Sequence, residues 1–185
     1  DRTTVDGVTS WGYMDDTGGQ VLPFDYASAS AFNEQGLAVV TNRAGEVAVI
    51  RESGAQVVPY QAGTASMFTF ADDQIVFRCG DVTRVYGTDG ALLGTFGRTA
   101  GFLRDGLIAS ADENGLWGYT SADGTAVIPA QYRSAGTFVS GRAIAQTAQG
   151  GYVVLQLPEA QLRTAALSAE PSEEPAADEV YTETA

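Results

Sequence analysis

Short runs of apolar residues alternate with glycine-containing turns along most of the chain. The first clear example joins Trp11-Gly12-Tyr13-Met14, through a polar segment at 15–20, to Val21-Leu22-Pro23. Short apolar runs bounded by Gly, Asp and Asn are typical of β-strands. Asp-Gly pairs between two such runs, as at Asp89-Gly90 and Asp123-Gly124, favour tight hairpins. The pattern therefore predicts many short antiparallel strands.

The strand pattern is an internal repeat. Trp11-Gly12-Tyr13 recurs as Trp117-Gly118-Tyr119, and Tyr13 has its counterparts at Val49, Val85 and Tyr119, spaced 36, 36 and 34 residues apart. A period of this length indicates stacked supersecondary units, none of which can bury its apolar face alone. We expect the structural anchors of the repeat to be Trp11, Pro23, Phe32, Phe68, Phe102, Trp117, Pro129 and Phe138.

These repeats predict a single all-β domain over residues 1–168. Each unit should contain about three short antiparallel strands, with the proline ending the second strand. The array should be curved or propeller-like, and the sequence leaves a closed ring open as an alternative. The expected units are 11–44, 45–80, 81–114 and 115–149, with a partial fifth at 150–158.

The pattern changes after Pro158. Residues 159–168 directly follow Pro158 and have helical apolar spacing, which predicts a short C-terminal helix that caps the last unit. Residues 169–185 contain six acidic residues and no basic residue, and this composition predicts an acidic tail or linker.

Charge and residue usage exclude several classes of function. The chain is acidic, with 23 Asp and Glu against 10 Lys and Arg and a net charge of −13. Such a surface repels phosphate backbones, so we expect no nucleic-acid partner. No apolar run is long enough to span a bilayer, so we expect no membrane insertion of this fragment. A neutral or basic partner fits the charge best.

Candidate chemistry is scarce. The chain contains no histidine and a single cysteine, Cys79, so His-dependent catalysis, Cys-cluster metal sites and internal disulfides are all unavailable. The acidic pairs Asp15/Asp16, Asp72/Asp73 and Asp112/Glu113 suit either turns, a glycosidase dyad or Ca²⁺ ligation. They lack the spacing of a calcium loop and occur where turns are expected, which favours the turn interpretation. We expect no enzyme activity, no metal and no cofactor.

The aromatic residues leave two interpretations open. Trp11 and Trp117 could be exposed stacking platforms, but a large ring beside glycine favours a place in the repeat core. Tyrosine offers a rigid apolar surface with a polar tip, which suits recognition. Tyrosines at matching repeat positions are therefore the candidate ligand-binding residues, namely Tyr13, Tyr26, Tyr119 and Tyr132.

The order Trp-Gly-Tyr, turn, Val-Leu/Ile-Pro, aromatic residue, Phe and Gly-Leu-Ala-Val resembles the WG-repeat family of bacterial proteins. The resemblance covers residues 11–155 and is strongest at 11–40 and 117–145. It implies a secreted or cell-surface, extracytoplasmic bacterial protein, and it supplies no catalytic residues. Copies two and three lack the Trp-Gly pair, so the array is not uniform.

The leading hypothesis is a non-catalytic binding module that recognises a glycan, a peptide or a protein. A structural spacer that presents a neighbouring domain is the alternative, and an acid-dyad glycoside hydrolase is a third. A binding module should expose clustered aromatic residues on a concave face, whereas a spacer should bury them. A hydrolase should place two carboxylates across a deep pocket.

Overall fold

The computed structural model describes residues 2–5, 8–62, 67–71 and 73–158. Within these ranges the chain forms eighteen β-strands and no helix. The strands are β1 (Arg2–Val5), β2 (Val8–Met14), β3 (Gln20–Tyr26), β4 (Ser28–Ala29), β5 (Leu37–Thr41), β6 (Val47–Arg51), β7 (Gln56–Gln61), β8 (Met67–Phe70), β9 (Gln74–Cys79), β10 (Val82–Gly87), β11 (Leu92–Phe96), β12 (Thr99–Arg104), β13 (Leu107–Ala111), β14 (Trp117–Ser121), β15 (Ala126–Tyr132), β16 (Ser134–Ala135), β17 (Arg142–Gln146) and β18 (Tyr152–Gln156).

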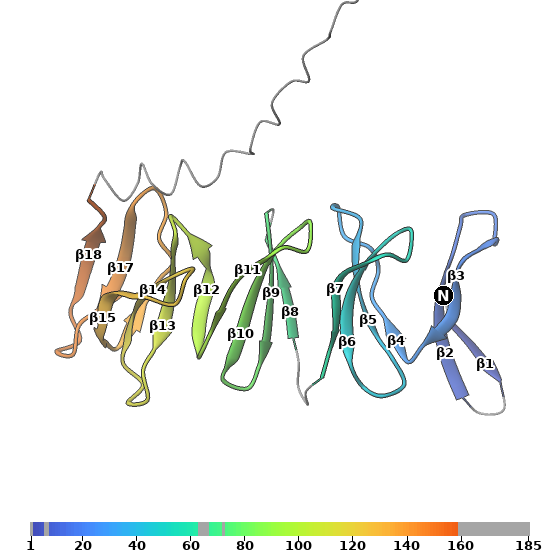
Figure 1. The fold of residues 1–185 in the computed structure, drawn as a ribbon, viewed down its shortest axis with the longest axis horizontal. Coiled ribbons are helices and arrows are strands. Elements are labelled where there is room, and N and C mark those ends of the chain that lie inside the picture. The colour runs from blue at the N-terminus through green and yellow to red at the C-terminus, as the bar shows by residue number, and fades with distance from the viewer. Residues whose placement is uncertain (1, 6–7, 63–66, 72, 159–185) are drawn as a thin grey trace, which may run out of the picture.

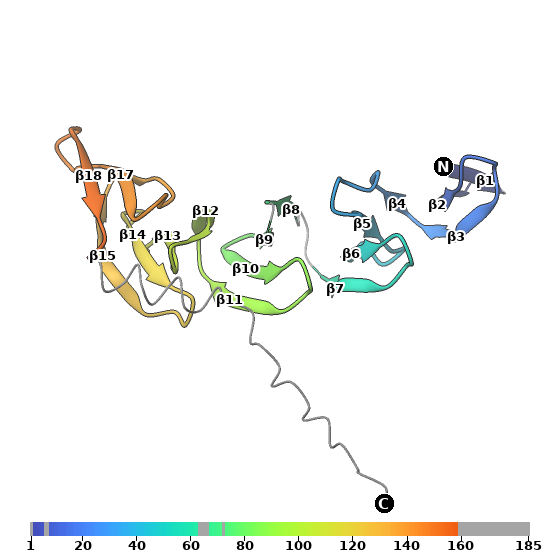
Figure 2. The same cartoon turned by 90° about the horizontal axis from the view of Figure 1, so that it is seen from above.

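The strands form five antiparallel sheets that follow one another along the molecule (Figure 1). We number them in chain order: sheet 1 is β1-β2-β3, sheet 2 is β4-β5-β6-β7, sheet 3 is β8-β9-β10-β11, sheet 4 is β12-β13-β14-β15, and sheet 5 is β16-β17-β18. Figure 2 shows that the sheets form an open arc, with β8 and β12 on its inner side and β7, β11 and β15 on its outer side. The described sheets therefore form an open array.

Each sequence repeat is divided between two sheets. The Trp-Gly-Tyr strand β2 and its return strand β3 belong to sheet 1, whereas β4 and β5 of the same repeat begin sheet 2. Sheet 2 is completed by β6 and β7, which open the second repeat, and sheets 3 and 4 are built in the same way. The expectation of three strands per unit is therefore corrected. A unit contributes two strands to one sheet and two to the next.

Apolar residues fill the four junctions between consecutive sheets. At the junction of sheets 1 and 2, for example, Leu22 packs against Ala38, Val40, Ala48 and Ile50. The repeated phenylalanines are distributed one to each junction, and the fourth is completely buried. In chain order these are Phe32, Phe68, Phe102 and Phe138.

The proline of the repeat lies inside an outer strand, which corrects the expectation that it ends the strand. In β15 the register shifts between the pairs Trp117–Tyr132 and Tyr119–Ile128, so a bulge surrounds Pro129. Proline is tolerated at such a position because an outer strand needs fewer ladder hydrogen bonds. A Cβ atom on Gly118 would collide with the Ile128 carbonyl oxygen and the Ala130 nitrogen. The glycine of Trp-Gly-Tyr is therefore required by the bulge opposite it.

The third repeat supports this explanation. Thr95 occupies the proline position there, and Arg84, in place of the glycine, pairs directly with Thr95 with no register shift at that point. The second repeat keeps Pro59 and a smaller register shift, between the pairs Val47–Gln61 and Val49–Val58, and Ala48 stands in place of the glycine. A side chain thus replaces the glycine where the bulge is smaller or absent.

The structure confirms the all-β, antiparallel prediction and leaves two further expectations untested. The expected capping helix at 159–168 and the acidic tail at 169–185 lie outside the described residues.

Candidate functional site

Two of the three acidic pairs supply an aspartate that accepts hydrogen bonds within a turn. Asp15 accepts hydrogen bonds from the Thr17 hydroxyl (2.7 Å) and the Gly19 amide (2.7 Å), and these bonds lower the pKa of its carboxyl group. Asp112 accepts from the amides of Asn114 and Leu116 at 2.9 and 2.8 Å. Such contacts are the usual reason for aspartate in turns.

The third acidic pair is described only in part. Asp72 lies outside the described residues, whereas Asp73 forms an ion pair with Arg104 at 2.7 Å. In the described part of the chain, no group of three or more Asp, Glu, His or Cys residues could hold a metal ion.

Two of the predicted ligand-binding tyrosines join neighbouring sheets. The Tyr119 hydroxyl donates a hydrogen bond to the Gly136 carbonyl oxygen at 2.8 Å, and its ring lies 4.6 Å from that of Phe138. Tyr13 repeats this arrangement with the Ser30 carbonyl oxygen at 2.8 Å and the Phe32 ring at 4.5 Å. Burial, with Tyr132 as the second cause, raises the pKa of Tyr119 to about 12. Burial, with Tyr26 as the second cause, likewise raises the pKa of Tyr13 to about 12.

The four predicted tyrosines do not form one patch. Tyr13 and Tyr26 contact each other edge to face, with ring centroids 6.2 Å apart, at the junction of sheets 1 and 2. Tyr119 packs at the junction of sheets 4 and 5, and only 1% of its surface is exposed. Stacking separates equivalent residues by whole sheets instead of collecting them on one face (Figure 1). Tyr132 is half-buried on the outer strand β15.

The tryptophans also lie partly inside the repeat. Trp11 and Trp117 are both half-buried, and Trp117 packs at the junction of sheets 4 and 5 with the Arg98 guanidinium 5.7 Å from its ring centroid. An Arg cation over an aromatic face is a favourable contact. Trp117, Tyr13 and Tyr119 thus pack at the junctions between neighbouring sheets.

A different surface gathers exposed apolar side chains, on the free face of sheet 5. Ile144 and Val154 are directly paired across β17 and β18, and they are 60% and 68% exposed. Their counterparts in sheet 2, Val39 and Val49, are paired in the same way, and Val49 is completely buried against sheet 3. The pair in sheet 5 therefore occupies a position that the preceding sheets cover.

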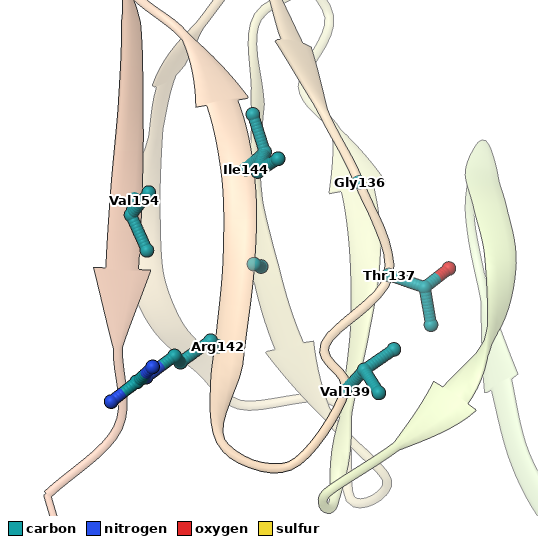
Figure 3. Close-up of a pocket in the computed structure, with 7 residues that line it drawn as sticks. Gly136, Thr137, Val139, Arg142, Ile144 and Val154 are labelled. Carbon is teal, nitrogen blue, oxygen red and sulfur yellow. The ribbon is translucent and has the colours of Figure 1, made fainter.

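We call this surface the end face. Besides Ile144 and Val154 it contains Val139, which lines the same depression, and Tyr152, which is two residues from Val154 and therefore on the same side of β18. The depression has a volume of about 450 Å³, and Arg142 and Thr137 lie at its margin. Figure 3 shows Val154 and Ile144 side by side on their two strands, with Val139 below.

The segment that carries the end face contains arginines and no acidic residue, although the Asp105 carboxylate lies close by and accepts a hydrogen bond from the Gly141 amide at 2.6 Å. Residues 124–158 include Arg133 and Arg142 and no Asp or Glu. A second depression of about 460 Å³, between sheets 2 and 3, is lined by Asn33, Glu34, Gln35, Phe70 and Ala71. Only one carboxylate lines it, and none lines the end-face depression, so neither of these two has the paired carboxylates of a glycosidase.

Sequence reasoning missed the end face because single positions of a repeat look alike. Ile144 and Val154 fit the apolar pattern of every other unit. A usable signal was present, however: the fifth unit stops at Pro158 after one strand, so the unit that would cover the preceding sheet is incomplete. In the part of the chain that the structure describes, there is no helix of the length and apolarity needed to cross a bilayer.

The geometry defines a class of protein, an open array of small antiparallel sheets tied together by a shared repeat. The family comparison is specific: residues 11–43 and 117–149 match the WG containing repeat family. The match is confined to these two regions, which are the two clearest copies of the repeat and the ones in which the Trp-Gly pair is present. No curated protein sequence matches the chain.

Solved structures resemble the chain only distantly. The computationally designed Ika4 protein is 14% identical over 66% of this chain and 86% of its own length, with a TM-score of 0.43. Hsv2 of Kluyveromyces lactis is 11% identical over 73% of this chain and 49% of its own, with a TM-score of 0.44. BamB from Moraxella catarrhalis is 14% identical over 70% and 42%, with a TM-score of 0.39. The chain thus spans less than half the length of the two natural proteins.

Proposed function

We propose that the protein is a non-catalytic recognition module that binds a protein or peptide partner through the end face of sheet 5. The observation that carries this proposal is the exposed Ile144–Val154 pair, because the equivalent pair in sheet 2 is covered by the next sheet. Clustered exposed apolar side chains of this kind mark interaction surfaces on soluble proteins.

The end face also refines the chemistry of the partner. The net charge of the whole chain favours a neutral or basic partner, but the end face lies in a stretch with two arginines and no acidic residue. A neutral or acidic apolar surface therefore complements this face better than a basic one. The predicted glycan partner is less well supported, since Tyr119 is buried and Tyr13 is half-buried in the junctions.

Two further parts of the proposal have separate support. An extracytoplasmic, bacterial location follows from the resemblance to WG-repeat proteins alone. The arc in Figure 2 supports a propeller-like arrangement, with sheets 3 and 4 running from the inner strands β8 and β12 to the outer strands β11 and β15.

A structural spacer is the second candidate, and one observation favours it. The repeat-equivalent tyrosines Tyr13 and Tyr119 bond to the backbone across strands instead of projecting as a platform. A spacer needs rigid junctions and no ligand, so it predicts that the end face binds nothing.

A phage-displayed random peptide library, selected on the full chain, separates these candidates. Selected clones should lose at least about tenfold in affinity on Ile144→Asp, which corresponds to roughly 1.4 kcal/mol. The matched control is Leu92→Asp, since Leu92 is 56% exposed on β11, away from sheet 5, and this variant should bind like the parent.

The tyrosine positions supply a second comparison. Tyr26→Ala and Tyr132→Ala should leave the binding of selected clones intact if the end face is the site. Clones that ignore Ile144 but require these tyrosines would move the site to the tyrosines. A selection that enriches nothing would favour the spacer, and hydrolysis of a displayed peptide would overturn the non-catalytic assignment.

A further inference from the structure

The two ends of the array expose the two kinds of sheet face that pack together at every internal junction. At the junction of sheets 2 and 3, Val49 on sheet 2 faces Ile75 and Phe77 on sheet 3. We call these the front face of one sheet and the rear face of the next. No other described sheet covers the front face of sheet 5, and none covers the rear face of sheet 1.

The rear face of sheet 1 carries exposed apolar side chains. Along β2, Val8 and Met14 alternate with Trp11 and Tyr13, and Tyr13 packs against sheet 2, so Val8 and Met14 lie on the opposite side. Met14 is 39% exposed and Val8 48% exposed. The counterpart of Met14 in sheet 2, Ile50, is buried against sheet 1.

The sequence segments that carry the two free faces differ in charge, although Arg43 donates a hydrogen bond to Ser10 of β2 and Asp105 accepts one from the Gly141 amide beside sheet 5. Residues 8–26, which form β2, β3 and the turn between them, contain Asp15, Asp16 and Asp25 and no basic residue. Residues 124–158, which include sheet 5, contain two arginines and no acidic residue. Bringing the ends together would therefore pair opposite charges around two apolar faces, which favours association and fixes its orientation.

We propose that the occupant of the end face is a second copy of this chain, bound head to tail so that its sheet 1 continues the array beyond sheet 5. This inference rests on the proposed function of the end face and names its partner. It uses the packing that already operates at the internal junctions, now between two molecules. Contact between two different surfaces is heterologous, so it can continue into longer assemblies or close into a ring.

The test is a complementation experiment by sedimentation velocity on chains that comprise residues 1–185. Ile144→Asp places a negative charge on the front face, where it would meet the aspartates of an incoming sheet 1. Met14→Arg places a positive charge on the rear face, where it would meet Arg142. Each variant alone should be monomeric, and an equimolar mixture should form a 1:1 heterodimer, since one intact front face and one intact rear face remain.

Several controls fix the interpretation. The parent chain and Leu92→Asp should form dimers and larger species, and salt should weaken them because the charges lie near the surface. Both blocking residues are exposed, and circular dichroism of each variant should match the parent. A Met14→Arg variant that still dimerises by itself would indicate a symmetric front-to-front contact and overturn the head-to-tail arrangement.

The outcome is independent of the peptide selection. A parent chain that stays monomeric in every mixture overturns the second-copy occupant, even if selected peptides bind the end face. A chain that associates only after removal of residues 169–185 would assign the face to that acidic segment, and this result would also overturn the proposal.

Discussion

The first and fourth repeats place a tyrosine where the second and third place a valine, and the junctions compensate for the difference. At the junction of sheets 1 and 2, Tyr13 packs over the small residues Ala38 and Ala48 of the facing sheet. At the next junction the valine, Val49, meets the large ring of Phe77. At this junction the ring is thus supplied by the facing sheet, whereas at the junction of sheets 3 and 4 Val85 packs with Phe96 of its own sheet.

This comparison explains why the middle repeats diverge in sequence while their packing persists. Protein interiors must be filled to high density, but the volume can come from either side of a contact. The Phe68 ring packs 5.2 Å from Phe77, much as Phe138 packs 4.6 Å from Tyr119. What the repeats share is therefore a set of filled junctions, and the residues that fill them can be exchanged.

The largest expected effect in this comparison is at Phe138. Its ring is completely buried, so Phe138→Ala should lower the free energy of unfolding by about 3–5 kcal/mol. Phe32 occupies the equivalent position but is half-buried, so Phe32→Ala should cost clearly less. Urea unfolding of both variants measures the difference, and equal losses would contradict the unequal burial of the two rings.

The exchange of volume across a junction can be tested by moving the ring. Val49→Tyr should overpack the second junction and cost about 1–3 kcal/mol. Phe77→Leu makes room on the facing strand, so the double variant should be more stable than the sum of the single losses predicts. A double-mutant cycle measures this coupling. Purely additive losses would show that the two sites do not share the space.

The smallest effect should come from the tyrosine hydroxyls. Tyr119→Phe removes the hydrogen bond to the Gly136 carbonyl oxygen and should cost about 0.5–1.5 kcal/mol. Tyr13→Phe removes the equivalent bond to Ser30 at a more exposed position and should cost less. Thermal melts at neutral pH provide the measurement, and a larger loss at Tyr13 would reverse the expected order.

The same tyrosines should govern stability in alkali. The folded pKa of Tyr119 is raised to about 12 from an unfolded value near 10, so folding favours the neutral phenol. This contribution is complete below pH 10 and is lost as the pH rises from about 10 to about 12. The Tyr119→Phe variant should therefore lose less stability than the parent across this interval.

The sequence predicted the strands, the turns and the period because each depends on local chemistry. Gly18, Gly54, Gly90 and Gly124 all have the positive φ expected of their hairpin turns. The assignment of strands to sheets could not be predicted, because it depends on which neighbouring strands pair. The repeat spacing is the same whether each repeat forms one sheet or is divided between two. The distance between Tyr13 and Tyr119 could not be predicted for a related reason: equivalence along the sequence indicates equivalent surroundings, and in a stack these lie at different junctions.

The division of every repeat between two sheets has a consequence for how the array unfolds. In a nearest-neighbour description, a repeat protein is stabilised by the intrinsic free energy of each unit and by coupling between units. Here a single repeat supplies only two strands to any one sheet, and a two-stranded hairpin is marginal in water. Almost all of the stability must then reside in the coupling. An elongated chain of this kind should melt as one cooperative body, and cutting it between repeats should cost far more than the contacts at the cut.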